Sequence, residues 1–365
     1  MQAQCHYLPT ASEHLLLQAL LAEDESAVIA AHAWLDTVEL EAINQGVQRM
    51  VPLLYFRMRA WGMQHPLRPK VKVIYQYYWL ADKRLRYQTE EVINILSGLA
   101  SPLVLLKGLA LGSTVYPDTA CRPTTDIDLL VTPSCFKDAI SRLRLSGFTS
   151  RAPAFHATTL FKSNFPEIDI HRSPYHRSFS AHFVAPLFDR LVSLRAHTFT
   201  LGAEDQLLHT IAHGTQSNVV SPLRWVVDAV LILRQATGSF RWQLFVAEAL
   251  RLNLIDAAAI ALQIIHTVDR HVVDTNALST LKNLRANVRQ SDRLITQENL
   301  IKQADGPLII WRITKGNSGV FGRLCLLLTH YVQMWGELGS GHIFKRSRYY
   351  VWHYLCAIVS KIIAR

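Results

Sequence analysis

The chain has 365 residues, half of them apolar, and a formal net charge of +10. This apolar fraction provides for a large core, so the composition excludes a wholly disordered chain and allows two or three domains. The positive charge favours an anionic partner, which leaves open a nucleotide, a nucleic acid or a membrane surface.

Redox and targeting features favour a reducing, cytoplasmic location. The five cysteines are scattered and form no C-x-x-C pair, which excludes a disulfide framework and the usual zinc-site spacing. The first apolar stretch runs into acidic residues too early for a secretion signal. No uninterrupted apolar run reaches the roughly 18–20 residues that span a bilayer.

Residues 1–100 are predicted to form an N-terminal helical segment. Apolar residues recur there at three- and four-residue steps, which is the period of a helix with one buried face. The pattern ends near Gly98, a residue type that often terminates helices.

Residues 101–200 have a different character and are predicted to form a mixed α/β core. The apolar run 102–106 reads as a strand that meets Lys107-Gly108 and then a short helix. Residues 126–131 predict a strand, and 134–147 a helix that begins at a serine cap and ends at a glycine. Three further strands are expected at residues 148–155, 158–165 and 167–173.

Helical periodicity returns at about residue 203, so residues 201–365 are predicted to form a C-terminal helical domain with a basic tail. The predicted fold class is therefore α+β, with a small mixed β-sheet flanked by N-terminal and C-terminal α-helical regions. A doubly wound sheet is excluded, because most of the predicted strands follow one another without crossover helices.

Two aspartates in the strand "DIDLLV" raise a question of charge. Asp126 and Asp128 are two residues apart, so they share one face of the strand, while Ile127, Leu129 and Val131 take the other. Neighbouring carboxylates repel unless a cation lies between them, and all-oxygen ligands of this kind suit Mg²⁺. Alone, the pattern also fits an edge strand with two solvated aspartates.

Three nearby features favour the metal site. Asp169 lies in a second predicted strand with the same apolar–acid alternation, so three carboxylates would converge if the strands were neighbours. The step from strand to helix at Lys107-Gly108 points backbone N–H groups at an anion, and Arg122 can bind a phosphate bidentately. Together these residues are typical of phosphoryl transfer.

The pattern "LLKGLAL…YP…CRPTTDIDLLV…IDIHRS" resembles the polymerase-β-like nucleotidyltransferase superfamily, and most closely its bacterial branch of uncharacterised nucleotidyltransferases. The likeness covers roughly residues 10–270 and leaves out the far C-terminus. It is carried by a strand ending in Lys-Gly, an arginine before Asp-x-Asp and a later Asp-x-His. Those elements correspond to Lys107, Gly108, Arg122, Asp126, Asp128, Asp169 and His171.

The resemblance implies transfer of a nucleoside monophosphate from an NTP such as ATP, with Mg²⁺ or Mn²⁺ as cofactor and release of pyrophosphate. The acceptor stays open among a small molecule, a sugar, a peptide or protein, and an RNA end. The three aspartates are the implied catalytic and metal-binding residues. Lys107, Gly108 and Arg122 would hold the triphosphate, and His171 would border the metal. Since the superfamily usually has Gly-Gly or Gly-Ser at the helix start, Gly112-Ser113 is a second candidate for the phosphate contact, with Ser113 the polar side chain.

Two other functions remain open. The protein could bind a nucleotide without turnover, although three intact aspartates argue against such a pseudo-enzyme. It could also be a peripheral-membrane assembly protein that acts through the basic tail at residues 344–365, although the apolar content of that tail favours a final packed helix. The sequence leaves the oligomeric state, the nucleobase and any nucleic-acid partner open.

Residues beyond the resemblance have simpler interpretations. His209 and His213 lie four apart on a predicted helix without a third zinc ligand, so they are read as partly buried histidines or as neighbours of the nucleotide. Arg224 and Asp228, also four apart, are expected to form an ion pair within one helix.

Overall fold

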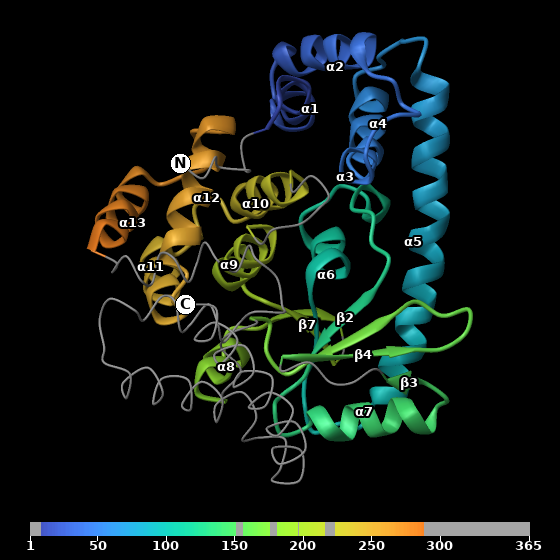
Figure 1. Ribbon diagram of the computed structural model, residues 1–365, viewed down its shortest axis with the longest axis vertical. Coiled ribbons are helices and arrows are strands. Elements are labelled where there is room, and N and C mark those ends of the chain that lie inside the picture. The colour runs from blue at the N-terminus through green and yellow to red at the C-terminus, as the bar shows by residue number, and fades with distance from the viewer. Residues whose placement is uncertain (1–8, 151–155, 176–180, 196, 216–222, 288–365) are drawn as a thin grey trace, which may run out of the picture. The chain divides into compact units, whose positions relative to one another are not determined.

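The computed structural model describes residues 9–150, 156–175, 181–195, 197–215 and 223–287, to which the statements below apply (Figure 1). All of these described residues belong to one compact unit. The basic tail, for which a membrane contact and a final packed helix were both left open, lies outside the described residues. Within the described part of the chain, no helix is long and apolar enough to cross a membrane.

The N-terminal region is helical, as its periodicity predicted. Local hydrogen bonds fix where its first two helices begin, because Thr10 and Glu13 form a reciprocal capping box and Asp24 accepts from the Ser26 N–H group. Trp34 is fully buried between these helices and the rest of the helical core. The helices are α1 (Ala11–Leu21), α2 (Glu25–Thr37), α3 (Gln45–Gln48), α4 (Val51–Ala60) and α5 (Arg68–Leu96).

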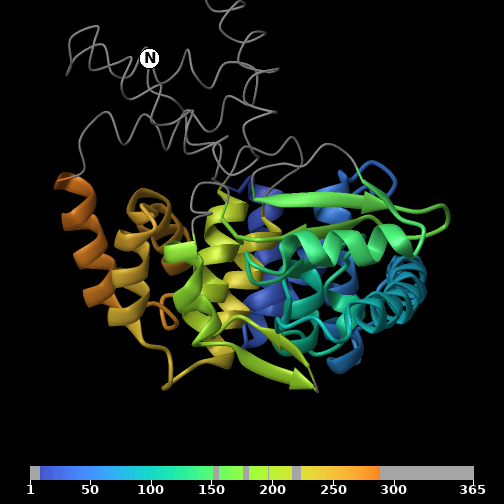
Figure 2. The same cartoon turned by 90° about the horizontal axis from the view of Figure 1, so that it is seen from below.

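Helix α5 connects the helical region to the sheet. Near its start, Val71 packs in the core of the helices, whereas Leu85, Val92 and Leu96 pack in the core beneath the sheet. Together with α7 (Phe136–Leu145), which lies alongside it, α5 covers one face of the sheet (Figures 1 and 2). The opposite face of the sheet is therefore the one on which a site can open.

The described residues form a seven-stranded mixed sheet in the order β3-β4-β5-β2-β1-β7-β6. Strand β2 pairs with β1 antiparallel and with β5 parallel. The mixed α+β class predicted from the sequence is confirmed. The strands are β1 (Leu103–Leu105), β2 (Ile127–Leu130), β3 (Thr149–Ser150), β4 (Ala157–Phe161), β5 (Ile168–His171), β6 (Val192–Arg195) and β7 (Thr198–Thr200).

The hairpin of β6 and β7 is an addition that the sequence analysis did not predict. Both strands are short, and β6 is largely exposed, so its residues carry no clear alternation of apolar and polar side chains. Strand β7 nevertheless pairs parallel with β1 and extends the sheet beyond the acidic strands. Of the expected strand at 148–155, β3 is the described part.

The C-terminal helices share one core with the N-terminal helices. Leu54 of α4 belongs to the same buried cluster as Leu208, Val230 and Leu262, which come from three helices after the sheet. The remaining helices are α6 (Lys107–Thr114), η1 (Thr119–Cys121), α8 (Ala181–Phe188), α9 (Ala203–Gly214), α10 (Arg224–Gln235), α11 (Trp242–Arg251), α12 (Ile255–Val268) and α13 (Thr275–Asn287).

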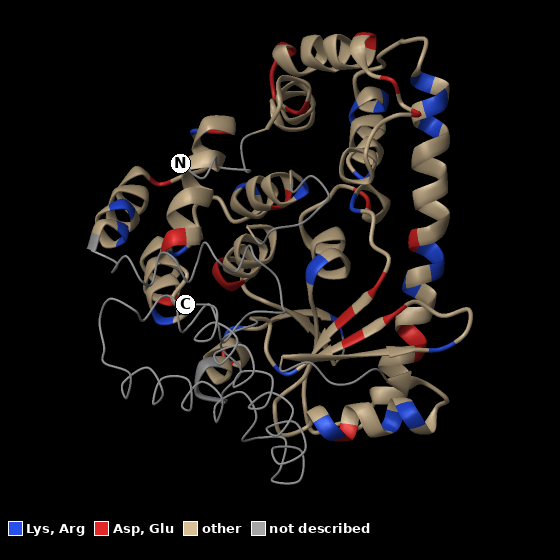
Figure 3. Cartoon of the chain, in the orientation of Figure 1, with Lys and Arg blue, Asp and Glu red and all other residues tan. Residues whose placement is uncertain are grey.

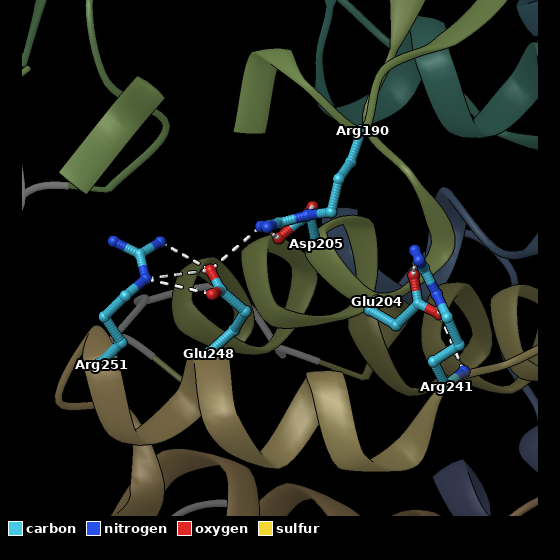
Figure 4. A network of polar contacts seen from close by, with 6 residues as sticks. All are labelled: Arg190, Glu204, Asp205, Arg241, Glu248 and Arg251. Atoms are coloured by element: carbon cyan, nitrogen blue, oxygen red, sulfur yellow. Dashed lines mark hydrogen bonds and ion pairs between the residues drawn. The ribbon is translucent and has the colours of Figure 1, made fainter. Parts of the chain in front are cut away.

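A network of ion pairs fixes α9 against its surroundings (Figure 4). Arg190, just before β6, donates to both oxygens of Asp205 on α9 at 2.9 Å and to Glu248 on α11 at 3.0 Å. Arg251 also pairs with Glu248, and Glu204 accepts from Arg241. Because Asp205 is buried, its bidentate bonds replace the water that it loses, and α9 is held in one position.

Two leucines on α7 test whether this helix is anchored through the core beneath the sheet. Leu143 is fully buried and Leu145 is 89% exposed. Leu143→Ala is expected to lower the free energy of unfolding by about 2–5 kcal/mol, since it leaves a cavity. Leu145→Ala is the matched control and should change it by less than about 0.5 kcal/mol. Urea denaturation measures both, and equal effects would contradict the described packing.

Candidate active site

The register of β2 and β5 brings the acidic strands together. Asp128 lies directly opposite Asp169 in a parallel pair, and Leu130 lies opposite His171. One ligand atom from each of Asp128, Asp169 and His171 lies within 4.8 Å of the others. The two acidic strands are therefore neighbours, which was the condition for their carboxylates to converge, and their acidic residues appear on adjacent strand ribbons (Figure 3).

Asp128 is the most deeply buried carboxylate of this group, with 1% of its surface exposed. The Lys107 Nζ atom donates to its Oδ1 atom at 2.6 Å, and the His171 Nε2 atom lies 2.8 Å from the same oxygen. Burial alone would raise the pKa of Asp128, but the charge of Lys107 and the bond from His171 outweigh it and hold the pKa well below its usual value. Asp128 therefore stays ionised.

Lys107 reaches Asp128 through an unusual backbone conformation. Its φ angle is 48°, in the left-handed region that side chains other than glycine seldom adopt. The preceding Leu106 N–H group donates to the Asp128 carbonyl at 3.0 Å, which ties the end of β1 to β2. Such strain costs about 1–2 kcal/mol and persists where the surroundings hold the residue in place, often at functional sites. Burial lowers the pKa of Lys107, but the nearby carboxylates raise it further, so the ammonium stays charged.

Asp126 lies at the edge of this group, just before β2, and is partly exposed. Burial raises the pKa of Asp126, and the negative charges of Asp128 and Asp169 add to that rise against the opposing charge of Lys107. A cation bound beside these carboxylates would offset their repulsion.

The residues present fit a divalent metal. The two carboxylates provide oxygen ligands that suit Mg²⁺ or Mn²⁺, and the imidazole of His171 lies beside them. Asp169 is oriented by Thr159 of β4, whose hydroxyl donates to its Oδ1 atom at 2.6 Å. The grouped ligands include His171, and Asp126, the remaining predicted ligand, lies at the edge of the group.

The two glycine pairs proposed for the phosphate contact have different surroundings. A Cβ atom on Gly108 would lie 1.9 Å from the Thr124 Oγ1 atom, so this glycine lets the segment before β2 pass close to the start of α6. Gly112 and Ser113 lie in the last turn of α6, where the Ser113 hydroxyl accepts from Arg86 of α5 at 2.9 Å. Of the two pairs, Lys107-Gly108 is the one that contacts the acidic cluster, because the Lys107 ammonium donates to Asp128.

Arg122 has a carboxylate partner where a phosphate contact was expected. Its Nε and Nη2 atoms donate to the two oxygens of Asp228 at 2.7 and 2.8 Å, and both side chains are almost fully buried. The Tyr116 hydroxyl donates to Asp228 at 2.7 Å. Asp228 therefore does not form the expected pair within α10, and Arg224 instead donates to the Pro123 carbonyl at 3.0 Å. The charged Asp228 in the apolar run "WVVDAVLIL" was the indication that a distant partner exists.

Aromatic and histidine side chains lie beside the cluster. His209 of α9 is buried and packs edge-on against Tyr175, with ring centroids 6.2 Å apart. Burial holds the pKa of His209 well below its usual value, and His213, Lys107 and His171 lower it further. His209 is thus a buried helical histidine, and it lies near Lys107 and His171. His156, which sequence reasoning missed, packs against His171 at 5.8 Å.

Comparisons with known proteins agree with this geometry. A sequence model of the family described as "Uncharacterised nucleotidyltransferase" matches residues 46–268, a stretch that contains the whole cluster. No curated protein and no solved structure matches the chain. The resemblance inferred from the motifs is confirmed.

The buried pair of Arg122 and Asp228 can be tested against an exposed pair. Asp228→Asn would leave a buried guanidinium without its counter-charge, so we expect the free energy of unfolding to fall by about 3–5 kcal/mol. Asp138→Asn removes the partner of Arg142 in a pair whose acid is 54% exposed, and should cost less than about 1 kcal/mol. Chemical denaturation of both variants measures the difference in the free energy of unfolding. A loss at Asp228→Asn as small as that at Asp138→Asn would contradict a stabilising role of the buried Arg122–Asp228 pair.

Proposed function

The chain belongs to the uncharacterised nucleotidyltransferase family, and from this membership we propose that it moves a nucleoside monophosphate from an NTP to an acceptor hydroxyl. The observation that carries the proposal is the register that places Asp128 opposite Asp169, with His171 beside them and Lys107 bound to Asp128. Paired carboxylates with a nearby cation are suited to binding a metal–triphosphate complex.

In the proposed reaction, the acceptor oxygen forms a bond to the α-phosphorus of the NTP. The bond from that phosphorus to the oxygen bridging the β-phosphorus breaks, and pyrophosphate leaves with the electron pair. Asp126, Asp128 and Asp169, with His171 beside them, would hold Mg²⁺ or Mn²⁺, which would offset negative charge on the entering and leaving oxygens.

Each residue of the cluster has a distinct proposed role. Asp169 accepts the proton of the acceptor hydroxyl, and Thr159 keeps the carboxylate oriented through its 2.6 Å bond. Lys107, which is part-exposed, shares its charge between Asp128 and the triphosphate. Arg122 is a positioning residue, because its bond to Asp228 fixes the segment that leads to Asp126.

Asp126→Asn is the substitution that best separates catalysis from folding. Burial and the neighbouring charges disfavour the ionised Asp126, so its removal should leave the melting temperature unchanged or higher. Transfer should fall by about 100-fold or more, as is usual when charge stabilisation in the transition state is lost. Asp128→Asn is less informative, because it also removes the carboxylate that pairs with Lys107.

The assay is incubation with each α-labelled NTP and Mg²⁺, followed by mass analysis of the protein and of added cell-extract fractions. We expect the unaltered protein to label an acceptor with at least one NTP and to release pyrophosphate in equal amount. Asp138→Asn, which changes an exposed residue in the first turn of α7, is the control and should keep full transfer activity. Equal transfer by Asp126→Asn would remove the acidic strand from the reaction.

Metal binding should depend on the nucleotide. Mg²⁺ and Mn²⁺ prefer phosphate oxygens to complete their coordination, so we expect weak binding to the free protein and much tighter binding with a non-hydrolysable NTP. Isothermal titration calorimetry measures both affinities. Nucleotide binding of equal affinity with and without metal would argue against a shared site.

A further inference from the structure

A second group of cationic side chains surrounds a small cavity between the N-terminal and C-terminal helices. The cavity has a volume of about 10 Å³, and its lining includes Arg49, Arg224 and Tyr116. Arg49 comes just before α4, and Arg224 is the first residue of α10. A space of this size holds about one water molecule.

The two arginines around this cavity lack counter-charges of their own. In the parts of the chain that the structure describes, neither Arg49 nor Arg224 forms an ion pair, and the hydrogen bond of Arg224 goes to the Pro123 carbonyl. Asp228, whose negative charge acts on Arg224, is already bound by the Nε and Nη2 atoms of Arg122. Burial lowers the pKa of Arg224 to about 9, and the charges of Arg122 and Arg49 contribute. Uncompensated charge of this kind is costly in the absence of an anion.

The two helix starts make the surroundings more positive. Neither α4 nor α10 has a side-chain cap on its first N–H groups, and neither has an acidic residue in its first turn. An uncapped helix start carries a partial positive charge, so Arg224 at the start of α10 is unfavourable there, and an anion near either helix start would be stabilising. An anion bound at this cavity would therefore interact favourably with both helix starts and with both guanidinium groups.

We propose that this cavity is a binding site for a phosphate group. Guanidinium groups present planar pairs of donors that match phosphate oxygens, which makes phosphate the anion class that suits Arg49 and Arg224. Arg49 is partly exposed, so its side chain can move outward to admit an anion larger than water. This site goes beyond the proposed transfer reaction and does not depend on it.

The site is connected to the acidic cluster through the segment between them. Arg224 holds the Pro123 carbonyl, and three residues later the chain reaches Asp126. A phosphate that moved the Arg224 side chain toward the cavity would break or shift its bond to Pro123, and would therefore change the position of Asp126. The phosphate could be free or could belong to a bound nucleotide, and the experiment below distinguishes these sources.

The test uses the full chain without divalent metal, titrated with inorganic pyrophosphate, with chloride at equal ionic strength as the reference. We expect a saturable rise in melting temperature with pyrophosphate, because a ligand that binds only the folded state stabilises it. Arg49→Gln and Arg224→Gln should each weaken the apparent affinity at least tenfold. Arg224→Gln should also melt at a higher temperature than the unaltered protein when no anion is present. Arg144→Gln, an exposed arginine of α7, is the matched control and should respond normally.

A non-hydrolysable NTP with Mg²⁺ then identifies the source of the phosphate. If a nucleotide phosphate fills the cavity, Arg49→Gln should weaken the binding of both the NTP analogue and pyrophosphate. If a free anion fills the cavity, Arg49→Gln should weaken the binding of pyrophosphate alone. The proposal is overturned if pyrophosphate acts no differently from chloride, or if both arginine variants keep the full response. Pyrophosphate binding that needs Arg49, in a protein without NMP transfer, would support this site and refute the enzymatic proposal.

Discussion

The pairing of β2 with β5 is the constraint on which the rest of the site depends. A parallel register places Asp128 against Asp169 on the sheet face away from α5 and α7, where two ionised carboxylates would repel one another. Lys107 offsets part of this repulsion, because its left-handed backbone conformation directs its ammonium to Asp128. The ammonium thus offsets part of the negative charge of the carboxylates in the folded protein. The metal ion of a metal–nucleotide complex would add further positive charge beside the same oxygens.

A second interaction holds the approach to this strand. The bidentate pair of Arg122 and Asp228 joins the segment before β2 to α10, which packs in the core shared by the N-terminal and C-terminal helices. Helices from both ends of the unit therefore fix the position of Asp126, although none of them contributes a carboxylate to the cluster. This arrangement explains why a basic residue close to the acidic motif is buried and paired.

Short-range patterns in the sequence predicted much of the fold and of the cluster. The alternation around Asp128 and Asp169 and the glycine after Lys107 are local, and they predicted β2, β5 and the start of α6 correctly. Contacts between distant residues were not predictable in the same way. Asp228 lies 106 residues from Arg122, and within its own helix Arg224 was the more obvious partner. The exposed β6 was missed because it lacks a buried face to create a period.

The central claim is that the carboxylates facing each other across β2 and β5 hold a metal together with a nucleotide. Its most direct test is anomalous diffraction from crystals grown with Mn²⁺ and a non-hydrolysable NTP. The account predicts an anomalous peak within bonding distance of both Asp128 and Asp169, next to density for the triphosphate. A nucleotide bound elsewhere, with no metal between these two carboxylates, would contradict it.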